Sequence, residues 1–287
     1  MTETPPSLIK WTGSKRSQAA AIAAFFPRKR DVGYFEPFLG GGAVAYLAAQ
    51  TFARVCASDL YAPLIDLWNN VKLHPESVIN QYKDDWGKLQ SDFPGYFFEV
   101  RDRFNQNPNG QDLLFLSRTC VNGIIRFNKK GEFNNSIHLS RRGMKPAIFG
   151  KIVTRWNSVL GNTTFSTHDY SEILEDVGRD DFVYLDPPYF NSHNRYVQDL
   201  DIEKFLVFLD ALNRKGAKWA LSFDGSRGDE NLTYELPREL YRFHTKLTSG
   251  NSAVQKVLND SVQKVDESLY LNYEPVPASV KQLNLDL

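Results

Sequence analysis

The stretch D180-D-F-V-Y-L-D-P-P-Y189 organises the rest of the chain. The four residues before its last acid are apolar or aromatic, which predicts a short buried strand. Two prolines follow, and because proline has no N–H and a fixed φ, the strand cannot continue past Asp186. In an open α/β sheet, ligands bind beyond the carboxyl ends of the strands. The corner would offer a carboxylate, two proline carbonyls and the Tyr189 ring. These groups suit a planar molecule with an exocyclic amine, such as a nucleobase, although D-P-P-Y alone also fits an ordinary tight turn.

Composition excludes several classes of protein. The chain has 287 residues, 42% of them apolar, with no apolar run long enough to span a membrane. Its first residues are polar and acidic, unlike a signal peptide. Cys56 and Cys120 lie in apolar contexts without a C-x-x-C motif, which favours buried free thiols, and five scattered histidines give no metal-binding spacing. We therefore expect a cytoplasmic protein with no metal site.

Charge is unevenly distributed although the net charge is zero. Nine basic residues and one acid, Glu132, lie between Arg118 and Arg155, and the stretch from Asp169 to Asp186 compensates with seven acids and one arginine. Phenylalanine, asparagine and glycine interrupt the basic block. A basic block is often only a solvated surface, but this composition also suits contact with phosphates.

A glycine loop precedes the first acid of interest. The sequence Y34-F-E-P-F-L-G-G-G-A-V-A45 predicts an apolar strand, a turn with three glycines, and a helix from Ala43 to Gln50. A second strand, A53-R-V-C-A-S-D59, ends in Asp59, where an acid typically binds ribose hydroxyls. The dinucleotide fingerprint G-x-G-x-x-G is absent. The pattern indicates a nucleoside site, with a plain glycine turn as the alternative.

The N-terminal segment L8-I-K-W-T-G-S-K-R16 ends in a polar turn. Ser14 is a candidate cap for a helix from Lys15 to Phe26, which Pro27 would stop. Trp11 and two lysines close to the helix start could serve an aromatic or anionic ligand.

Further along the chain, the pattern predicts an interrupted α/β protein. Residues 60–72 and 74–103 read as helices, 113–121 as another, and 122–135 as a hairpin with N-G and K-K-G turns. Strand 163–170, a helix at 171–177 capped by Ser171, helix 202–213 and strand 218–223 resume the α/β pattern, followed by two paired strands at 239–247 and 267–273. We predict a Rossmann-like α/β domain from residues 1–66 and 153–287. The inserted domain, 67–152, would be mostly helical and end in a basic β-hairpin.

Six motifs in this order carry a family resemblance: I9-K-W-T-G-S-K15, F35-E-P-F-L-G-G-G42, S58-D59, N122-G-I-I-R-F-N-K-K-G-E-F-N134, D186-P-P-Y189 and V265-D-E-S-L-Y270. The chain resembles the Dam-type (D12 class, alpha order) DNA adenine N6-methyltransferases. The resemblance implies transfer of a methyl group from S-adenosyl-L-methionine to a flipped-out adenine in a short site, GATC-like or a variant, of double-stranded DNA. It also implies a Rossmann-like methyltransferase sheet, a target-recognition insertion, a bacterial or phage origin, a monomer, and a cognate restriction endonuclease as a candidate partner.

The resemblance further implies roles for individual residues. The catalytic corner would be Asp186, Pro187, Pro188 and Tyr189. The cofactor would contact Trp11, Lys15, Phe38, Gly40, Gly42, Asp59, Asp169 and Asp186. DNA would contact Lys10, Asn122, Ile124, Arg126, Asn128, Lys129, Lys130, Arg141, Arg142 and Lys145. Arg126 would read a base and Lys10 lies where the family also contacts a base, while Lys129, Lys130, Arg141, Arg142 and Lys145 would contact phosphates.

One departure from the family pattern affects site preference. The family's GATC readers carry a Gly-Arg-Tyr step after G-E-F-N, whereas this chain has N135-S-I-H-L-S-R-R-G143, in which Arg141 or Arg142 could take its place. Other functions stay open at this point: N4-cytosine methylation, an RNA substrate, a DNA-binding module without turnover, and a nucleotide-dependent oxidoreductase. The absence of a Pro-Cys motif disfavours a covalent cytosine mechanism.

Overall fold

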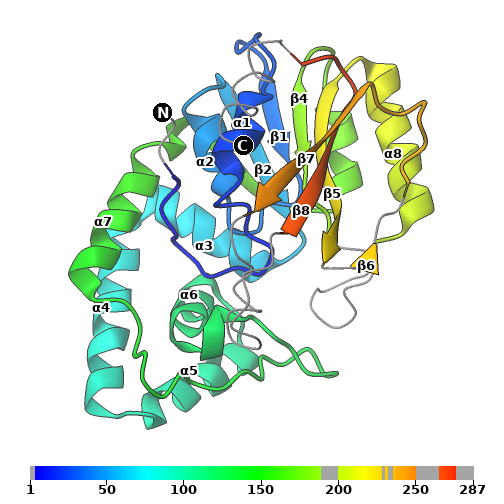
Figure 1. Cartoon of the computed structure of the whole chain (residues 1–287). Helices are drawn as coiled ribbons and strands as arrows, with labels where there is room; N and C mark the ends of the chain where they lie inside the picture. Colours follow the sequence, from blue (N-terminus) through cyan, green and yellow to red (C-terminus); the bar gives the residue numbers. More distant parts are fainter. Residues whose placement is uncertain (1–3, 189–199, 228–229, 232–234, 250–264, 276–287) are drawn as a thin grey trace.

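A single sheet, with its strand order reversing once, forms the centre of the molecule. The computed structural model describes residues 4–188, 200–227, 230–231, 235–249 and 265–275 (Figure 1). The strands are β1 (Gly33–Glu36), β2 (Arg54–Asp59), β3 (Thr163–Thr167), β4 (Phe182–Leu185), β5 (Lys218–Arg227), β6 (Glu230–Asn231), β7 (Phe243–Ser249) and β8 (Val265–Leu271). Their order is β3-β2-β1-β4-β5-β8-β7, with the short β6 paired to β5. The five neighbouring strands β3, β2, β1, β4 and β5 are parallel to one another, while β8 runs antiparallel to β5 and β7. The predicted Rossmann-like α/β fold and the pairing of the two late strands are therefore confirmed.

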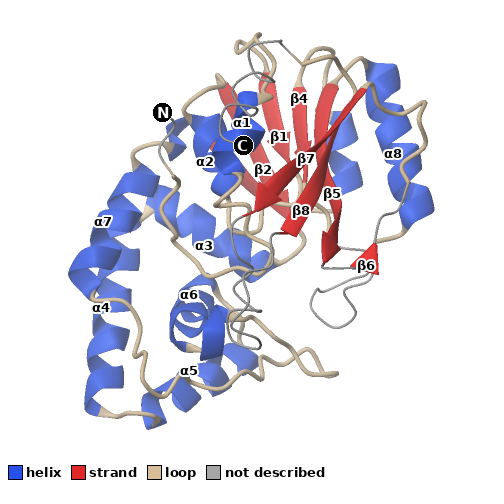
Figure 2. Ribbon diagram, in the orientation of Figure 1, coloured by secondary structure: helices blue, strands red, loops and turns tan. Residues whose placement is uncertain are grey.

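Both faces of the sheet are buried because helices cover each of them (Figure 2). On β1, Tyr34 joins one apolar core and Phe35 the other, as the alternation of a strand requires. The first core includes side chains of α1 (Ala19–Ala24), α2 (Ala43–Ala49) and α3 (Ala62–Leu73). The second includes side chains of η3 (Tyr170–Glu175) and α8 (Ile202–Lys215). The apolar strand before Asp186 is thus buried on both sides, as its sequence predicted.

The insertion is helical and shares the core of the first face. Its helices are α4 (Pro75–Ser91), α5 (Gly95–Gln106), α6 (Gly110–Thr119) and α7 (Pro146–Asn157). α4, α5 and α6 lie beyond one end of the sheet, and α7 leads from them back to the sheet domain (Figure 1). Trp68 of α3 and Trp156 of α7 pack with ring centroids 4.6 Å apart. The predicted bounds at 67 and 152 fall inside α3 and α7, because both helices contact the sheet domain and the insertion.

Two helix predictions need correction. The expected helix from Lys15 to Phe26 is only α1, and Ser14 does not cap it: Gln18 holds the N-cap position, with no side-chain hydrogen bond. The preceding residues form turns that carry the Lys15 side chain inward instead of continuing the helix. The single helix expected at 74–103 is split into α4 and α5 before Gly95, since Pro94 cannot donate the backbone hydrogen bond that a continuous helix needs.

The basic segment is irregular. Where a β-hairpin was predicted, the chain makes two isolated antiparallel bridges, Cys120–Ile137 and Phe127–Phe133, with a short 3₁₀ turn, η1 (Val121–Gly123), at the start. Asn128 closes the tip, because its Oδ1 accepts from two backbone amides and its amide group donates to Glu132. The predicted turn is therefore present, but a continuous two-stranded ladder is not.

The junction after β3 also differs from the prediction. β3 ends at Thr167, and Asp169, not Ser171, caps the following helix η3. The Asp169 carboxylate accepts from the backbone amide of Ser171, and Glu172 completes a reciprocal capping box. A short 3₁₀ helix η2 (Leu160–Asn162) leads into β3.

The prediction of two buried free thiols is confirmed in part. Cys56 and Cys120 are both free thiols, but only Cys120 is buried, and Cys56 is half-buried. None of the helices in the described ranges is long and apolar enough to cross a membrane.

Candidate active site

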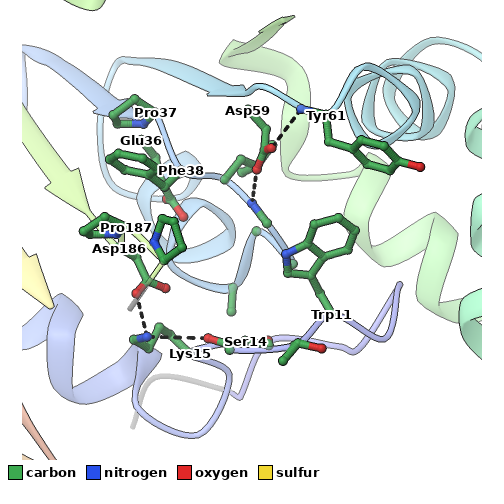
Figure 3. A pocket seen from close by; sticks show the side chains of 18 of the residues that line it. Trp11, Ser14, Lys15, Glu36, Pro37, Phe38, Asp59, Tyr61, Asp186 and Pro187 are labelled. Carbon is green, nitrogen blue, oxygen red and sulfur yellow. Dashed lines mark hydrogen bonds and ion pairs between the residues drawn. The ribbon is translucent and has the colours of Figure 1, made fainter. Parts of the chain in front are cut away.

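The candidate site lies where the strand order reverses. β1 and β4 are adjacent and parallel, yet the chain leaves them towards opposite sides of the sheet, which opens a crevice at their carboxyl ends. A pocket lies in this crevice (Figure 3). Its walls come from the N-terminal turn, the ends of β1, β2 and β4, and the insertion, and include Trp11, Lys15, Glu36, Phe38, Gly40, Gly42, Asp59, Tyr61, Ile125, Phe127, Tyr170, Asp186, Pro187 and Pro188. The fold therefore brings together nearly all the predicted cofactor residues.

Glycines shape the loop after β1. Gly40 and Gly42 have φ values of +47° and +66°, in the left-handed region that favours glycine. A Cβ on Gly40 would lie 2.9 Å from the Trp11 indole, and one on Gly42 would lie 2.9 Å from Trp68. The glycines thus admit two tryptophan side chains against the loop, a role that the sequence alone did not indicate.

Asp59 fixes that loop from the end of β2. Its carboxylate accepts hydrogen bonds from the backbone amides of Gly40 at 3.0 Å and Tyr61 at 3.1 Å (Figure 3). Burial raises the pKa of the Asp59 carboxyl, while these amide hydrogen bonds oppose the increase. Each carboxylate oxygen can accept more than one hydrogen bond, so Asp59 keeps capacity for a ligand.

Asp186 faces a buried lysine. Its Oδ1 lies 2.6 Å from Nζ of Lys15, which also lies 2.9 Å from Oε1 of Glu267. The Asp186 side chain is 20% exposed, whereas that of Lys15 is only 6% exposed. The pKa of the Asp186 carboxyl is raised to about 6, mainly by burial, although Lys15 opposes the increase and Glu267 adds to it. Asp186 is therefore more basic than an exposed aspartate.

A third acid in the pocket, besides Asp59 and Asp186, was not singled out from the sequence. Glu36 ends β1, is 3% exposed and lines the pocket. The Tyr34 hydroxyl donates to its Oε2 at 2.5 Å. Burial raises the pKa of Glu36 well above its usual range, despite the opposing hydrogen bond from Tyr34. The motif F35-E-P-F could have marked Glu36, because the first residues after β1 face the crevice.

Aromatic rings form the apolar walls. Phe38 stacks on Tyr170 with ring centroids 5.3 Å apart. Trp11 and Tyr61 are 6.2 Å apart, and Tyr61 meets Phe127 edge-on at 5.6 Å. Because Phe127 belongs to the basic segment, the insertion contributes directly to the pocket wall. These walls suit a flat, partly apolar ligand.

Not every predicted residue lies in the pocket. Asp169 caps η3 and borders a neighbouring surface groove instead, although Tyr170 beside it lines the pocket. Pro187 and Pro188 line the pocket, and Tyr189 lies outside the described residues. Within the described ranges, no group of three His, Cys, Asp or Glu side chains is arranged to hold a metal ion.

The predicted DNA residues form two groups. Eight are exposed: Lys10, Asn122, Arg126, Lys129, Lys130, Arg141, Arg142 and Lys145. Ile124 and Asn128 are half-buried, and the Asn128 side chain is used within its own turn. Lys10 joins the group in space because its side chain packs against Gly123, next to Asn122.

Arg118 and Arg142 of the basic block pack against other parts of the protein. Arg118 is half-buried and donates to the backbone carbonyls of Ser7 and Leu8, so it holds the N-terminal segment. The Arg142 guanidinium lies over the Phe93 ring, 4.1 Å from its centroid. Arg141 makes no comparable ring contact in the described structure and is the freer of the two candidates at the Gly-Arg-Tyr position.

Comparisons with known proteins agree with this architecture. A family model described as "D12 class N6 adenine-specific DNA methyltransferase" matches residues 11–251. The type II methyltransferase M.MjaIII of Methanocaldococcus jannaschii is 32% identical over 241 residues, covering 75% of this chain and 82% of that protein. A DNA adenine methylase of Vibrio cholerae is 28% identical over 187 residues, covering 64% of this chain and 65% of its own length. The DNA N-6-adenine-methyltransferase of Escherichia phage P1 is 25% identical over 246 residues, which are 80% of this chain and 31% of the phage protein. The family match spans most of the sequence and includes the pocket, so the chain belongs to the D12 class N6 adenine-specific DNA methyltransferases.

Proposed function

We propose that this adenine-specific DNA methyltransferase binds S-adenosyl-L-methionine in the pocket and methylates N6 of an adenine flipped out of double-stranded DNA at a short specific site. The observation that carries the proposal is the Asp186 carboxylate at the strand-order reversal. It lies in one pocket with Pro187, the glycine loop and Asp59. A carboxylate held at that position can accept a hydrogen bond from an exocyclic amine.

The residues present fit the proposed cofactor. Asp59 has acceptor capacity for ribose hydroxyls, and Phe38, Tyr170 and Trp11 supply flat walls for the adenine and the sulfonium. Glu36 is a buried acid within the pocket, and it would pair with the ammonium of the methionine tail. Asp169 is a weaker candidate for the adenine, because its carboxylate is engaged as a helix cap.

S-adenosyl-L-methionine supplies, when bound, an electrophilic methyl group on a sulfonium. Asp186 and the Pro187 carbonyl would each accept one N–H from the adenine amine, which turns the nitrogen lone pair towards the incoming methyl. Positioning of this kind accounts for a large part of the barrier reduction in group transfers. As the N6–carbon bond formed, the carbon–sulfur bond of the sulfonium would break, the sulfur would leave as a neutral thioether, and N6 would have to lose one proton. The Asp186 carboxylate, ionised above about pH 6, would accept it.

Flipping of the base has an energetic cost that stacking offsets. Unpairing and unstacking a base costs a few kcal/mol, and stacking on an aromatic ring returns about 1–3 kcal/mol. We assign this role to Tyr189, as its place directly after Asp186-Pro-Pro suggests. The exposed cations of the insertion would hold the duplex by its phosphates, with Lys10 and Arg126 closest to the bases.

Three further assignments are part of the proposal. Residues 1–66 and 153–287 would form the catalytic domain and 67–152 the target-recognition domain, with α3 and α7 shared between them. We also propose that the enzyme acts as a monomer and that a cognate restriction endonuclease is a candidate partner.

The test is methyl transfer by Asp186→Asn. Purified protein with tritiated S-adenosyl-L-methionine and duplex DNA should label adenine. The single-turnover rate of the variant should be about 10²- to 10³-fold lower, as expected when a preorganised polar contact is removed. Affinity for DNA should change little. Asp180→Asn is the matched control, since Asp180 is 43% exposed, pairs with Lys29 at the surface and lies before the same strand. Label on cytosine, or full activity of Asp186→Asn, would contradict the proposal.

A further inference from the structure

Three elements far apart in the sequence contribute to one buried charge cluster. Lys15 comes from the turn before α1, Asp186 from the corner after β4, and Glu267 from the antiparallel strand β8. Lys15 Nζ lies 2.6 Å from Asp186 Oδ1, 2.9 Å from Glu267 Oε1 and 3.5 Å from the Gly13 carbonyl oxygen. An ammonium has three protons to donate, so these three acceptors match its capacity.

The cluster carries more negative than positive charge. When all three side chains are ionised, two carboxylates share one ammonium, so these three side chains of the described structure together carry a charge of −1. Lys15 paired with Asp186 alone would neutralise that carboxylate and weaken it as an acceptor and base. Glu267 restores the excess negative charge next to the position where the amine nitrogen becomes positive.

We propose that Glu267 is a positioning residue for methyl transfer, which shares the Lys15 ammonium and so keeps Asp186 both oriented and basic. The inference rests on the function proposed for Asp186. Lys15 contacts Oδ1 of Asp186 and fixes the plane of the carboxylate, which leaves Oδ2 with capacity to accept from the adenine amine.

Other titratable groups face Asp186 from the neighbouring strands. They are Tyr34 and Glu36 of β1 and Tyr184 of β4. Burial raises the pKa of both phenols well above the usual range, so they are uncharged at neutral pH, and it raises the pKa of Glu36 in the same way. Among the described residues, ion pairs join Lys15 to Asp186 and Lys15 to Glu267, and the inference rests on these two contacts.

The decisive variant is Glu267→Gln, which keeps the size and the acceptor oxygen but removes the charge. Removing a like charge a few ångströms away lowers the pKa of Asp186, and we expect the acid limb of the single-turnover pH–rate profile to move down by about one pH unit. The plateau rate should fall about tenfold, because a less basic Asp186 is a weaker proton acceptor. Lys15→Met should move the acid limb in the opposite direction. Glu274→Gln is the matched control, an exposed glutamate just beyond β8.

A purely structural role would give a different result. Glu267→Gln would then lower the melting temperature and the plateau rate but leave the acid limb in place, and this outcome, like an unchanged profile, would overturn the inference. A carbon-13 titration of the Asp186 carboxyl, assigned with Asp186→Asn, reads the same shift without turnover. If wild-type protein failed to label adenine, the proposed function would fail, while this titration would still decide whether Glu267 controls Asp186.

Discussion

Arg126 offers the sharpest test of how the enzyme would select its site. Its side chain is exposed, and Asn134 holds it at two points: Nε donates to the Asn134 Oδ1 at 2.9 Å and Nη2 to the Asn134 carbonyl oxygen at 3.3 Å. A guanidinium has five N–H groups, so three are left to face outward. Two of these suffice for bidentate pairing with O6 and N7 of a guanine.

The perturbation is Arg126→Ala. A bidentate arginine–guanine pair contributes about 1–3 kcal/mol of discrimination, which corresponds to roughly 5- to 150-fold in kcat/KM. We expect that loss on DNA with the preferred base pair and almost none on DNA in which that pair is replaced. Arg126→Lys should lose nearly the same discrimination, because lysine keeps the charge but not the planar fork.

The assay measures methylation rates across a pool of duplexes with randomised positions, at several salt concentrations. Lys129→Ala is the comparison variant, since Lys129 is exposed in the turn of the same segment. As a phosphate contact, Lys129 should affect all sequences alike, and its loss should reduce the slope of log affinity against log salt by about 1. If Arg126→Ala behaved in the same way as Lys129→Ala, the assignment of Arg126 as a base reader would be refuted.

Two further predictions concern the cofactor pocket. Because burial raises the pKa of Glu36, binding of a cationic methionine tail should release a proton from Glu36, and the affinity for the cofactor should therefore rise with pH. Calorimetry in two buffers of different ionisation heat measures the number of protons released. The same number in Glu36→Gln would contradict the assignment. Gly40→Ala should lower the unfolding free energy by about 1–2 kcal/mol through its positive φ and weaken cofactor binding by displacing Trp11. Gly131→Ala is the control both in urea titrations and in cofactor binding, because Gly131 also has a positive φ but no atom within 4 Å of the added Cβ. If both variants weakened cofactor binding equally, the contact with Trp11 would not be the cause.

The pocket could be located from the sequence because its main parts follow strand ends. The apolar run before Asp186, the glycines after β1 and the acid at the end of β2 are local patterns. In a parallel sheet, strand ends of the same polarity lie at one edge, so local patterns suffice to predict that these residues meet. The paired late strands, the helical insertion and the free thiols were predictable for similar reasons.

Some local predictions failed because tertiary contacts override local preference. Ser14 has the chemistry of a helix cap, but the chain before α1 turns so that Lys15 reaches Asp186 and Glu267. Ser171 was expected to cap the helix after β3, but the carboxylate of Asp169 takes that role. Arg118 was counted with the basic block, whereas it is half-buried and donates to the backbone carbonyls of Ser7 and Leu8.

The sequence by itself thus determined the sheet, the corner at Asp186 and the family to which the chain belongs. Only the tertiary structure decided which charged side chains surround Asp186, because Lys15 and Glu267 are separated by 252 positions and no sequence periodicity links them. Burial sets the pKa of Asp186 and of Glu36, and burial depends on how helices, strands and the insertion pack together. The D-P-P-Y corner is therefore visible in the sequence, whereas the charge balance that would make it reactive exists only in the folded chain.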